Sequence, residues 1–134
     1  MLCLEYMFKG ILPVFLVTSF LISCDGNAEI GPNDEVSLRI HNKSALTFDE
    51  IFVAAPNDSN TYYNLNPGLA SPYKQFKKLY RYSYIRIKSA DREFILQPID
   101  YVGESPLNAG KYTYVLDIDD PNYTYSVSLE LRQD

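Results

Sequence analysis

The only imidazole in the chain, His41, is the first residue to test for chemistry, because a Ser–His–acid triad requires one. It falls on the outward-facing positions of an alternating segment, and the sequence shows no partner for it. Asp100 and Glu104 form a carboxylate pair of the kind that glycoside hydrolysis uses, but a domain of this size leaves little depth for a substrate cleft. We therefore predict no catalytic residue, and a small hydrolase stays a remote alternative.

Four oxygen-bearing side chains lie close together in the sequence at Asp117, Asp119, Asp120 and Asn122. Their spacing differs from that of a calcium-binding EF-hand loop. Counted from Asp117, the sixth position is Asn122 instead of glycine, and the twelfth is Ser128 instead of glutamate. We interpret this segment as a turn, and we predict no metal and no cofactor.

Cys24 is the residue with the clearest chemistry, because it closes a segment typical of export signals. Residues 11–22 (ILPVFLVTSFLI) carry no charge, and their length is short of the roughly 20 residues of a membrane-spanning helix. Preceded by Lys9, the run has the length of the hydrophobic region of a signal peptide. Its end, Leu21-Ile22-Ser23-Cys24, resembles the bacterial lipobox, in which the Cys thiol receives a diacylglycerol and becomes the new N-terminus after cleavage.

The alternative for Cys24 is a buried thiol in a core helix, which Pro13 inside the run disfavours. We predict that residues 1–23 are a lipoprotein signal peptide and that Cys24 anchors the protein to the cell envelope, with the outer membrane as the expected site. The single acid directly after Cys24 leaves the membrane face open. A start at Met7 makes a more compact signal peptide than a start at Met1, so we expect translation to begin at Met7.

Composition limits the rest of the chain to one folded domain. The chain has 134 residues, of which 46% are hydrophobic and 22% are charged, and these values are typical of a globular protein. A net charge of −5 argues against a nucleic-acid partner, since phosphates attract surplus Lys and Arg. Residues 24–34 are rich in Gly, Asp and Asn, which predicts a flexible tether, and residues 35–134 are the predicted domain.

Alternation of apolar and polar residues predicts strands along this domain. The clearest signal is a hairpin whose two strands are joined by the turn at 119–122. Only 71–79 suggests a helical turn, with Ser71 as N-cap and Pro72 at the first position. The predicted strands and the turns between them together indicate an all-β, antiparallel β-sandwich of about seven strands. The predicted strands cover residues 35–41, 46–55, 61–65, 79–89, 93–97, 112–118 and 123–132.

Tyrosine is abundant, and eleven of the twelve tyrosines follow Cys24. Those on the last two predicted strands share a face with aliphatic residues, so we predict that most of them lie at the edge of the core. On the 79–89 segment the tyrosines instead share a face with cations. That face is a candidate binding surface for a glycan or an anionic partner such as acidic polysaccharide or lipid headgroups; the alternative is a solvated strand edge. Its residues are Tyr80, Tyr82, Tyr84, Arg86 and Lys88.

Three segments, residues 80–85, 97–107 and 110–114, resemble a group of small lipoproteins of Bacteroidota, over most of residues 36–132. The resemblance implies an envelope location and no catalytic residue. The strand entry Gly110-Lys111-Tyr112-Thr113 is similar to one common in immunoglobulin-like and transthyretin-like sandwiches, which makes these the two expected types.

The expected function is a non-enzymatic binding or accessory module, attached to the membrane through Cys24, with a glycan or an envelope protein as partner. One alternative is a structural or assembly subunit that uses a sheet edge to bind a partner strand. The remote alternative is a small envelope hydrolase.

Overall fold

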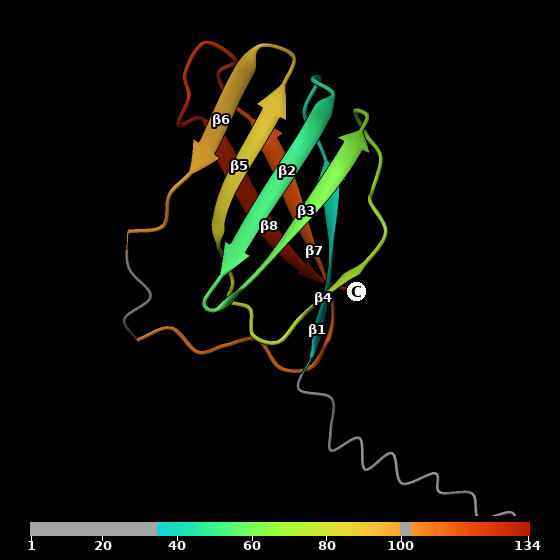
Figure 1. Cartoon of the computed structure of the whole chain (residues 1–134), viewed down its shortest axis with the longest axis vertical. Helices are drawn as coiled ribbons and strands as arrows, with labels where there is room; N and C mark the ends of the chain where they lie inside the picture. The colour runs from blue at the N-terminus through green and yellow to red at the C-terminus, as the bar shows by residue number, and fades with distance from the viewer. Residues whose placement is uncertain (1–34, 100–102) are drawn as a thin grey trace, which may run out of the picture. The chain divides into compact units, whose positions relative to one another are not determined.

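The computed structural model describes residues 35–99 and 103–134, and these residues contain strands and loops but no helix (Figure 1). The predicted signal peptide, Cys24, the tether and Asp100 lie outside the described residues. In the described part no helix is long and apolar enough to cross a membrane. The eight strands are β1 (Val36–Asn42), β2 (Phe48–Ala55), β3 (Asp58–Leu65), β4 (Lys74–Phe76), β5 (Tyr84–Ser89), β6 (Arg92–Leu96), β7 (Gly110–Ile118) and β8 (Val127–Gln133).

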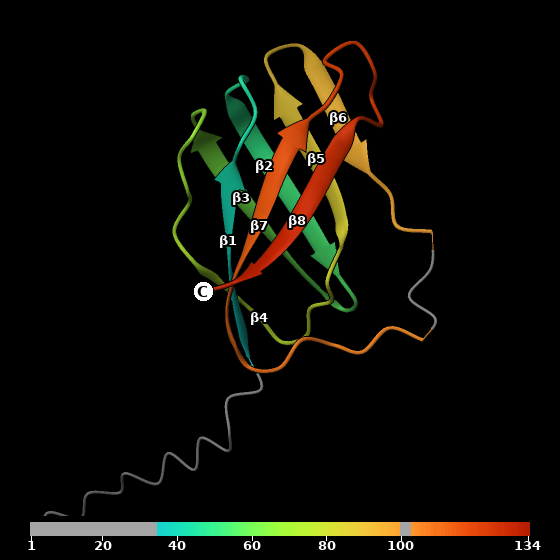
Figure 2. The ribbon, with the colours of Figure 1, turned by 180° about the vertical axis from the view of Figure 1, so that it is seen from behind.

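The strands form two four-stranded sheets that lie face to face in a sandwich-like arrangement (Figures 1 and 2). One sheet has the order β4-β1-β7-β8 and the other β3-β2-β5-β6. The all-β, two-layered prediction is therefore confirmed, although the described strands number eight instead of about seven. Pairing is antiparallel except between β1 and β7, which run parallel, so the expectation of a purely antiparallel fold is wrong at this pair.

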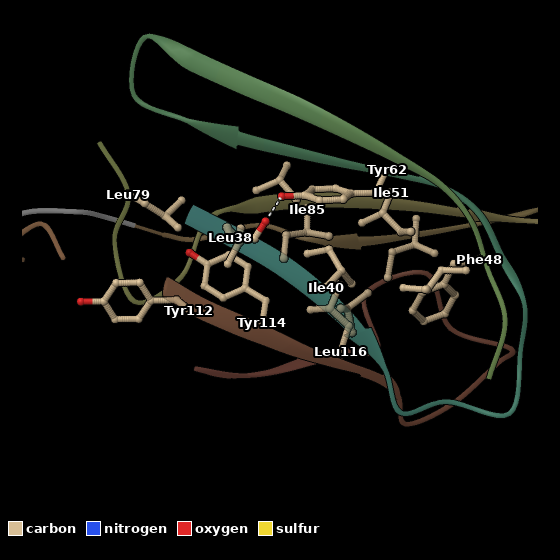
Figure 3. Close-up of a cluster of buried hydrophobic side chains, with 14 of the residues drawn as sticks. Leu38, Ile40, Phe48, Ile51, Tyr62, Leu79, Ile85, Tyr112, Tyr114 and Leu116 are labelled. Atoms are coloured by element: carbon tan, nitrogen blue, oxygen red, sulfur yellow. Dashed lines mark hydrogen bonds between the residues drawn. The ribbon is translucent and has the colours of Figure 1, made fainter. Parts of the chain in front are cut away.

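A single hydrophobic core fills the space between the sheets, because alternate residues of each strand point inward (Figure 3). Leu38 and Ile40 of β1 and Ile85 of β5 are fully buried in it. The buried ring of Tyr62 crosses this core and its hydroxyl donates a hydrogen bond to the Leu38 carbonyl at 2.8 Å. Burial and the nearby Tyr114 raise the pKa of Tyr62, so its hydroxyl stays a donor that ties one sheet to the other.

The predicted helical turn at 71–79 is wrong. Lys74–Phe76 form β4, which pairs antiparallel with β1 and places Phe76 opposite Val36. Ser71 does not cap a helix, because its hydroxyl accepts a hydrogen bond from the Ile40 backbone N–H at 2.9 Å. Burial of the Phe76 ring, which is 0% exposed, outweighs the local helix-start signal of Ser71 and Pro72.

Three predicted strand starts differ from the structure by three residues or more. The strand predicted from residue 79 begins only at Tyr84, and the last strand begins at Val127 instead of residue 123. The turn predicted at 56–60 shortens to Pro56 and Asn57, with Asn57 at a φ of 59°, so β3 begins at Asp58. The predicted final hairpin is confirmed, with β7 and β8 paired along their length.

Candidate functional site: a groove along the free edge of β8

Three residues of the predicted tyrosine-rich face lie together on the outer surface of β5. Arg86 and Lys88 contact the Glu50 carboxylate of β2, at 3.5 Å and 3.1 Å. The Arg86 guanidinium lies 5.4 Å from the centre of the Phe52 ring, which packs edge-on against Tyr84 at 6.3 Å. The two cations of this face are therefore already engaged by neighbouring side chains of the same sheet.

The other two residues of the predicted face, Tyr80 and Tyr82, belong to the loop before β5. The Tyr80 carbonyl accepts a hydrogen bond from the buried Tyr114 hydroxyl at 2.6 Å. The Tyr82 hydroxyl donates to the Glu104 carboxylate at 3.0 Å. The structure thus splits the predicted face in two, because the chain becomes a strand only at Tyr84, and it brings Tyr82 to the side of the sandwich where β6 and β8 lie.

The sandwich has two sides where the edge of one sheet meets the edge of the other. On the first, β3 and β4 are neighbours and side chains cover their backbone groups. The Asn60 amide donates to the Gln75 carbonyl at 2.8 Å, and the Lys74 ammonium donates to the Thr61 carbonyl at 2.6 Å. These contacts close the β3–β4 side against further strand pairing.

Among the described residues, the β6–β8 side is closed at one end only. The loop that follows β7 crosses β6 there, where the Ile95 N–H donates to the Thr124 carbonyl at 2.8 Å. Arg92 reinforces the crossing by donating to the Pro121 carbonyl at 2.9 Å. Beyond this crossing, a cleft of about 630 Å³ lies between β8 and the segment from Leu96, the last residue of β6, to Ile99. Its lining includes Arg81, Tyr82, Leu96, Leu129 and Leu131.

A second hollow, of about 370 Å³, continues the first along the same strand. Arg81 and Leu131 line both hollows, and Gln133 lies at the far end of the second. We call the two hollows together the β8 groove; it follows β8 from Leu129 to Gln133. Within the part of the chain that the structure describes, Arg81 forms no ion pair, in contrast to Arg86 on the outer surface of β5.

Along this groove the outer edge of β8, opposite β7, has no paired strand among the described residues. Hydrogen bonds from Asp119 N–H to the Ser126 carbonyl (2.9 Å) and from Asp134 N–H to the Lys111 carbonyl (3.0 Å) extend the β7–β8 ladder at both ends. Even-numbered residues of β8 therefore direct their N–H and C=O groups to β7, and odd-numbered residues direct theirs to the free edge. The odd-numbered residues of β8 are Val127, Leu129, Leu131 and Gln133, and the last three line the groove.

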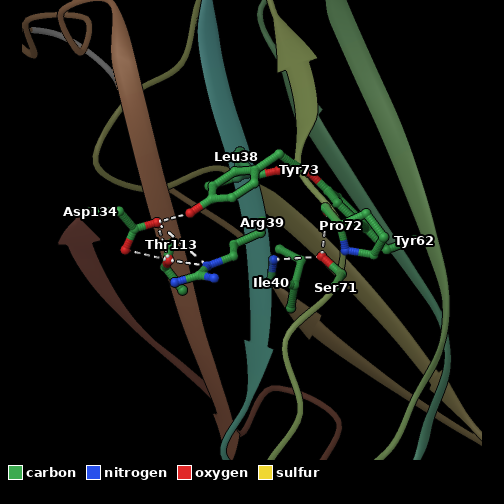
Figure 4. Close-up of polar contacts among 9 residues, drawn as sticks. All are labelled: Leu38, Arg39, Ile40, Tyr62, Ser71, Pro72, Tyr73, Thr113 and Asp134. Carbon is green, nitrogen blue, oxygen red and sulfur yellow. Dashed lines mark hydrogen bonds and ion pairs between the residues drawn. The ribbon is translucent and has the colours of Figure 1, made fainter.

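Apart from the groove, a polar cluster lies on the outer surface of the β4-β1-β7-β8 sheet (Figure 4). Tyr73 donates to the Asp134 carboxylate at 2.6 Å, and Thr113 donates to it at 2.7 Å while accepting from Arg39 at 2.9 Å. The Arg39 guanidinium and the Lys111 ammonium lie 5.0 Å and 5.2 Å from the centre of the Tyr73 ring. Within the cluster the Asp134 carboxylate forms an ion pair with Arg39. Its hydrogen bond from Tyr73 fixes the segment before β4 against the outer surface of the sheet.

Protonation in this cluster follows the same contacts. Desolvation opposes the charge of Asp134, but hydrogen bonds from Tyr73 and Thr113, together with the charge of Arg39, lower the pKa of Asp134 overall. The hydrogen bond to Asp134 raises the pKa of Tyr73. The carboxylate is thus held in its charged form as the acceptor at the centre of the cluster.

Of the four oxygen-bearing residues singled out in the sequence, Asp117 lies near the end of β7, and Asp119, Asp120 and Asn122 lie in the turn that follows it. Asp117 accepts a hydrogen bond from the Ile118 N–H at 2.8 Å, and Asp120 accepts one from the Asn122 N–H at 2.9 Å. Among the described residues no three His, Cys, Asp or Glu side chains are placed to hold a metal ion. His41 lies on β1, where its backbone pairs with Val115 of β7 and forms a bridge with Ala70.

Two tyrosines predicted at the edge of the core are exposed instead. Tyr123 and Tyr125 lie in the loop before β8, are 57% and 59% exposed, and pack edge-on at 5.9 Å. The same prediction is confirmed for Tyr112 and Tyr114, which are buried on β7. Arg81, Leu129 and Leu131 were not predicted as site residues. Alternation places the two leucines on one face, but no sequence signal marks β8 as an edge strand.

Comparisons of the chain with protein-family models, with curated proteins and with solved structures find no match.

Proposed function

We propose that this chain is a lipid-anchored protein of the cell envelope whose sandwich domain is a non-enzymatic binding or accessory module. The observation that carries the proposal is the segment Leu21-Ile22-Ser23-Cys24 at the end of the uncharged run 11–22, followed by a polar tether. The domain described above begins its first strand at Val36, twelve positions after Cys24. Acylated Cys24 fastens the domain to the membrane, with the outer membrane as the expected location.

Mass spectrometry of the full chain expressed in a bacterial host tests this anchor. We expect a product that starts at Cys24, carries acyl chains and sediments with membranes. Cys24→Ala is the matched control, because it leaves the hydrophobic run intact while removing the thiol. The precursor that accumulates in this variant also shows whether translation begins at Met7 or Met1. An unmodified thiol at Cys24, with residues 11–22 still attached, would refute the anchor.

The non-enzymatic part of the proposal is supported by how the polar side chains are used. The carboxylates of Glu50 and Asp134 are bound to neighbouring cations, and Glu104 accepts the Tyr82 hydroxyl. The competing hydrolase has its own test. Hydrolytic activity on a cell-envelope glycan that is lost on His41→Ala or Asp100→Asn would favour the enzyme over the binding module.

We also propose that the sandwich is of the transthyretin-like type. Its support is the strand order, in which β1 and β2 belong to different sheets and β1 runs parallel to β7. In the constant-type immunoglobulin arrangement the first, second, fourth and fifth strands share one sheet. Contacts between the backbone protons of Leu38 and Tyr112, observed by NMR, test the β1–β7 pairing on which this assignment depends.

A further inference from the structure

We propose that the free edge of β8 binds an extended protein segment as an added strand. Apolar side chains of the segment enter the β8 groove at alternate positions, and a carboxylate side chain of the segment meets Arg81. The inference rests on the binding role proposed above and makes it specific, since it names a protein strand as the partner.

The first support is the backbone of β8. Leu129, Leu131 and Gln133 direct N–H and C=O groups away from β7, and no described strand pairs with them. An added strand gains its affinity from such main-chain groups and its specificity from pockets for alternate side chains. From Leu129 to Gln133 the edge extends about 13 Å at ~3.3 Å per residue, which accommodates roughly five residues of partner.

The second support is the shape of the groove. Its two hollows share Arg81 and Leu131; the first reaches Leu129 and the second reaches Gln133, so together they follow β8 over these positions. Leu129 and Leu131 are only partly buried against the core, which leaves apolar surface for the alternate side chains of an incoming strand. A compact ligand would need one hollow, whereas an extended segment uses both.

The third support is charge. Arg81 is common to both hollows and has no ion-pair partner among residues 35–99 and 103–134. The other charged residue of the cleft, Glu130, is engaged by Arg132 at 2.9 Å. Among the described residues the groove therefore has one cation without an ion-pair partner, which favours a segment that carries an Asp or Glu on the same face as its apolar side chains.

The other edges are less suited to a partner strand. Side chains of Asn60 and Lys74 already bind carbonyls along the β3–β4 side. On β6 the Ile95 N–H, which points away from β5, is bound to the Thr124 carbonyl. Of the four edge strands in the described sheets, β8 is the one whose outward N–H and C=O groups lie along a groove without a bound side chain or loop.

Hydrogen exchange measured by NMR on the mature acylated protein in detergent micelles tests the proposal. Three synthetic peptides of about eight residues serve as probes. The first carries serine at one set of alternate positions and, at the other set, valine with one central aspartate, so that valine and aspartate share a face. The second has lysine in place of that aspartate, and the third is the first with N-methyl groups at alternate backbone nitrogens. We expect the first peptide to slow exchange of the Leu129, Leu131 and Gln133 amides by about tenfold or more. The even-numbered amides of β8 should be protected before any peptide is added.

The control peptides and variants separate backbone pairing from charge. The N-methylated peptide should give no protection, and the lysine peptide should bind about tenfold more weakly or worse. Arg81→Gln should weaken the aspartate peptide about fivefold, whereas Arg86→Gln, on the outer surface of β5, should not change its binding. Gln133→Pro removes one outward N–H without touching the β7 ladder, so it should reduce binding while the domain stays folded.

Several outcomes would overturn the proposal. Equal binding of all three peptides, or shifts of leucine methyl signals without amide protection, would indicate a compact apolar ligand site. Protection of the same amides that grows with protein concentration and needs no peptide would mean that a second copy of the chain occupies the edge. An unmodified Cys24 combined with peptide protection would refute the anchor and leave this inference standing.

Discussion

On the β3–β4 side and on the β6–β8 side of the sandwich, an edge of one sheet lies next to an edge of the other. The two sides differ in what covers the backbone groups of these edges. On the β3–β4 side, polar side chains reach across the gap and bind the backbone of the opposite edge. On the β6–β8 side, a loop binds one end of β6, and the remainder is a groove lined by Leu96, Leu129 and Leu131.

The difference shows which strand edges of this domain are blocked against pairing with another chain and which edge can still pair. Exposed strand edges pair readily with other chains, and proteins usually cover them with short strands, lysines or inward-pointing charges. β4 has three residues and carries Lys74, so it fits that description. β8 has seven residues and points two leucines inward, so it lacks those protections. The comparison leads to four predictions.

The largest effect is expected on the closed side at Phe76. Its ring is fully buried, so Phe76→Ala removes a large core contact and the anchor of β4, and should lower the free energy of unfolding by about 3–5 kcal/mol. Leu129→Ala on the open side should cost less than about 2 kcal/mol, since its side chain is only partly buried. Urea denaturation of both variants measures the difference, and equal losses would contradict the comparison.

Lys74→Met should lower the free energy of unfolding by about 1–2 kcal/mol. The substitution keeps the aliphatic stem but removes the ammonium that donates to Thr61 and lies 5.3 Å from the centre of the Tyr62 ring. Amide exchange along β3 should become faster. Lys77→Met is the matched control, because the Lys77 contact to Asp58 uses its backbone N–H and is retained. A loss of the same size in the control would show that the bridge across the gap is not the cause.

A smaller effect is expected in the pH dependence of stability, through Asp134. Its pKa in the folded protein lies below the ordinary value of 3.8, so its contribution to stability is complete above that value and is lost as the pH falls through the folded pKa. Urea midpoints measured from about pH 6 to about pH 2 should fall more steeply for the parent than for Asp134→Asn. Parallel curves would show that the Tyr73–Asp134 contact does not stabilise the segment before β4.

The smallest effect on stability is expected for Arg81→Gln, which should change the free energy of unfolding by no more than about 0.5 kcal/mol. Arg81 lines the groove without an ion pair in the described part of the chain, so folding gains little from its charge. Thermal denaturation measures this directly. A large loss of stability would mean that Arg81 stabilises the loop before β5, which would contradict the proposed role of its charge in binding a partner.

Much of the fold could be predicted from the sequence, because alternation of apolar and polar residues is a local property. It identified the facing residues of β1 and the hairpin of β7 and β8. It failed where local and tertiary preferences conflict. The N-cap signal of Ser71 gave way to burial of Phe76, and the tyrosines at 80 and 82 continued an alternating pattern into a loop. The candidate site was only partly predicted, since Tyr82 lies in the groove and Arg86 does not.

By itself the sequence determined the inward and outward faces of the strands, since these depend on residues close together in the chain, and it carries the motif on which the proposed anchor at Cys24 depends. Only the tertiary structure decided which strands became neighbours. β1 lies beside β7, with Arg39 bound to Thr113 across 74 positions of sequence, and β8 is left with a free edge next to Arg81. Sheet pairing joins distant segments through backbone groups that every residue carries, so no local pattern identifies the partner strand or the edge that remains unpaired.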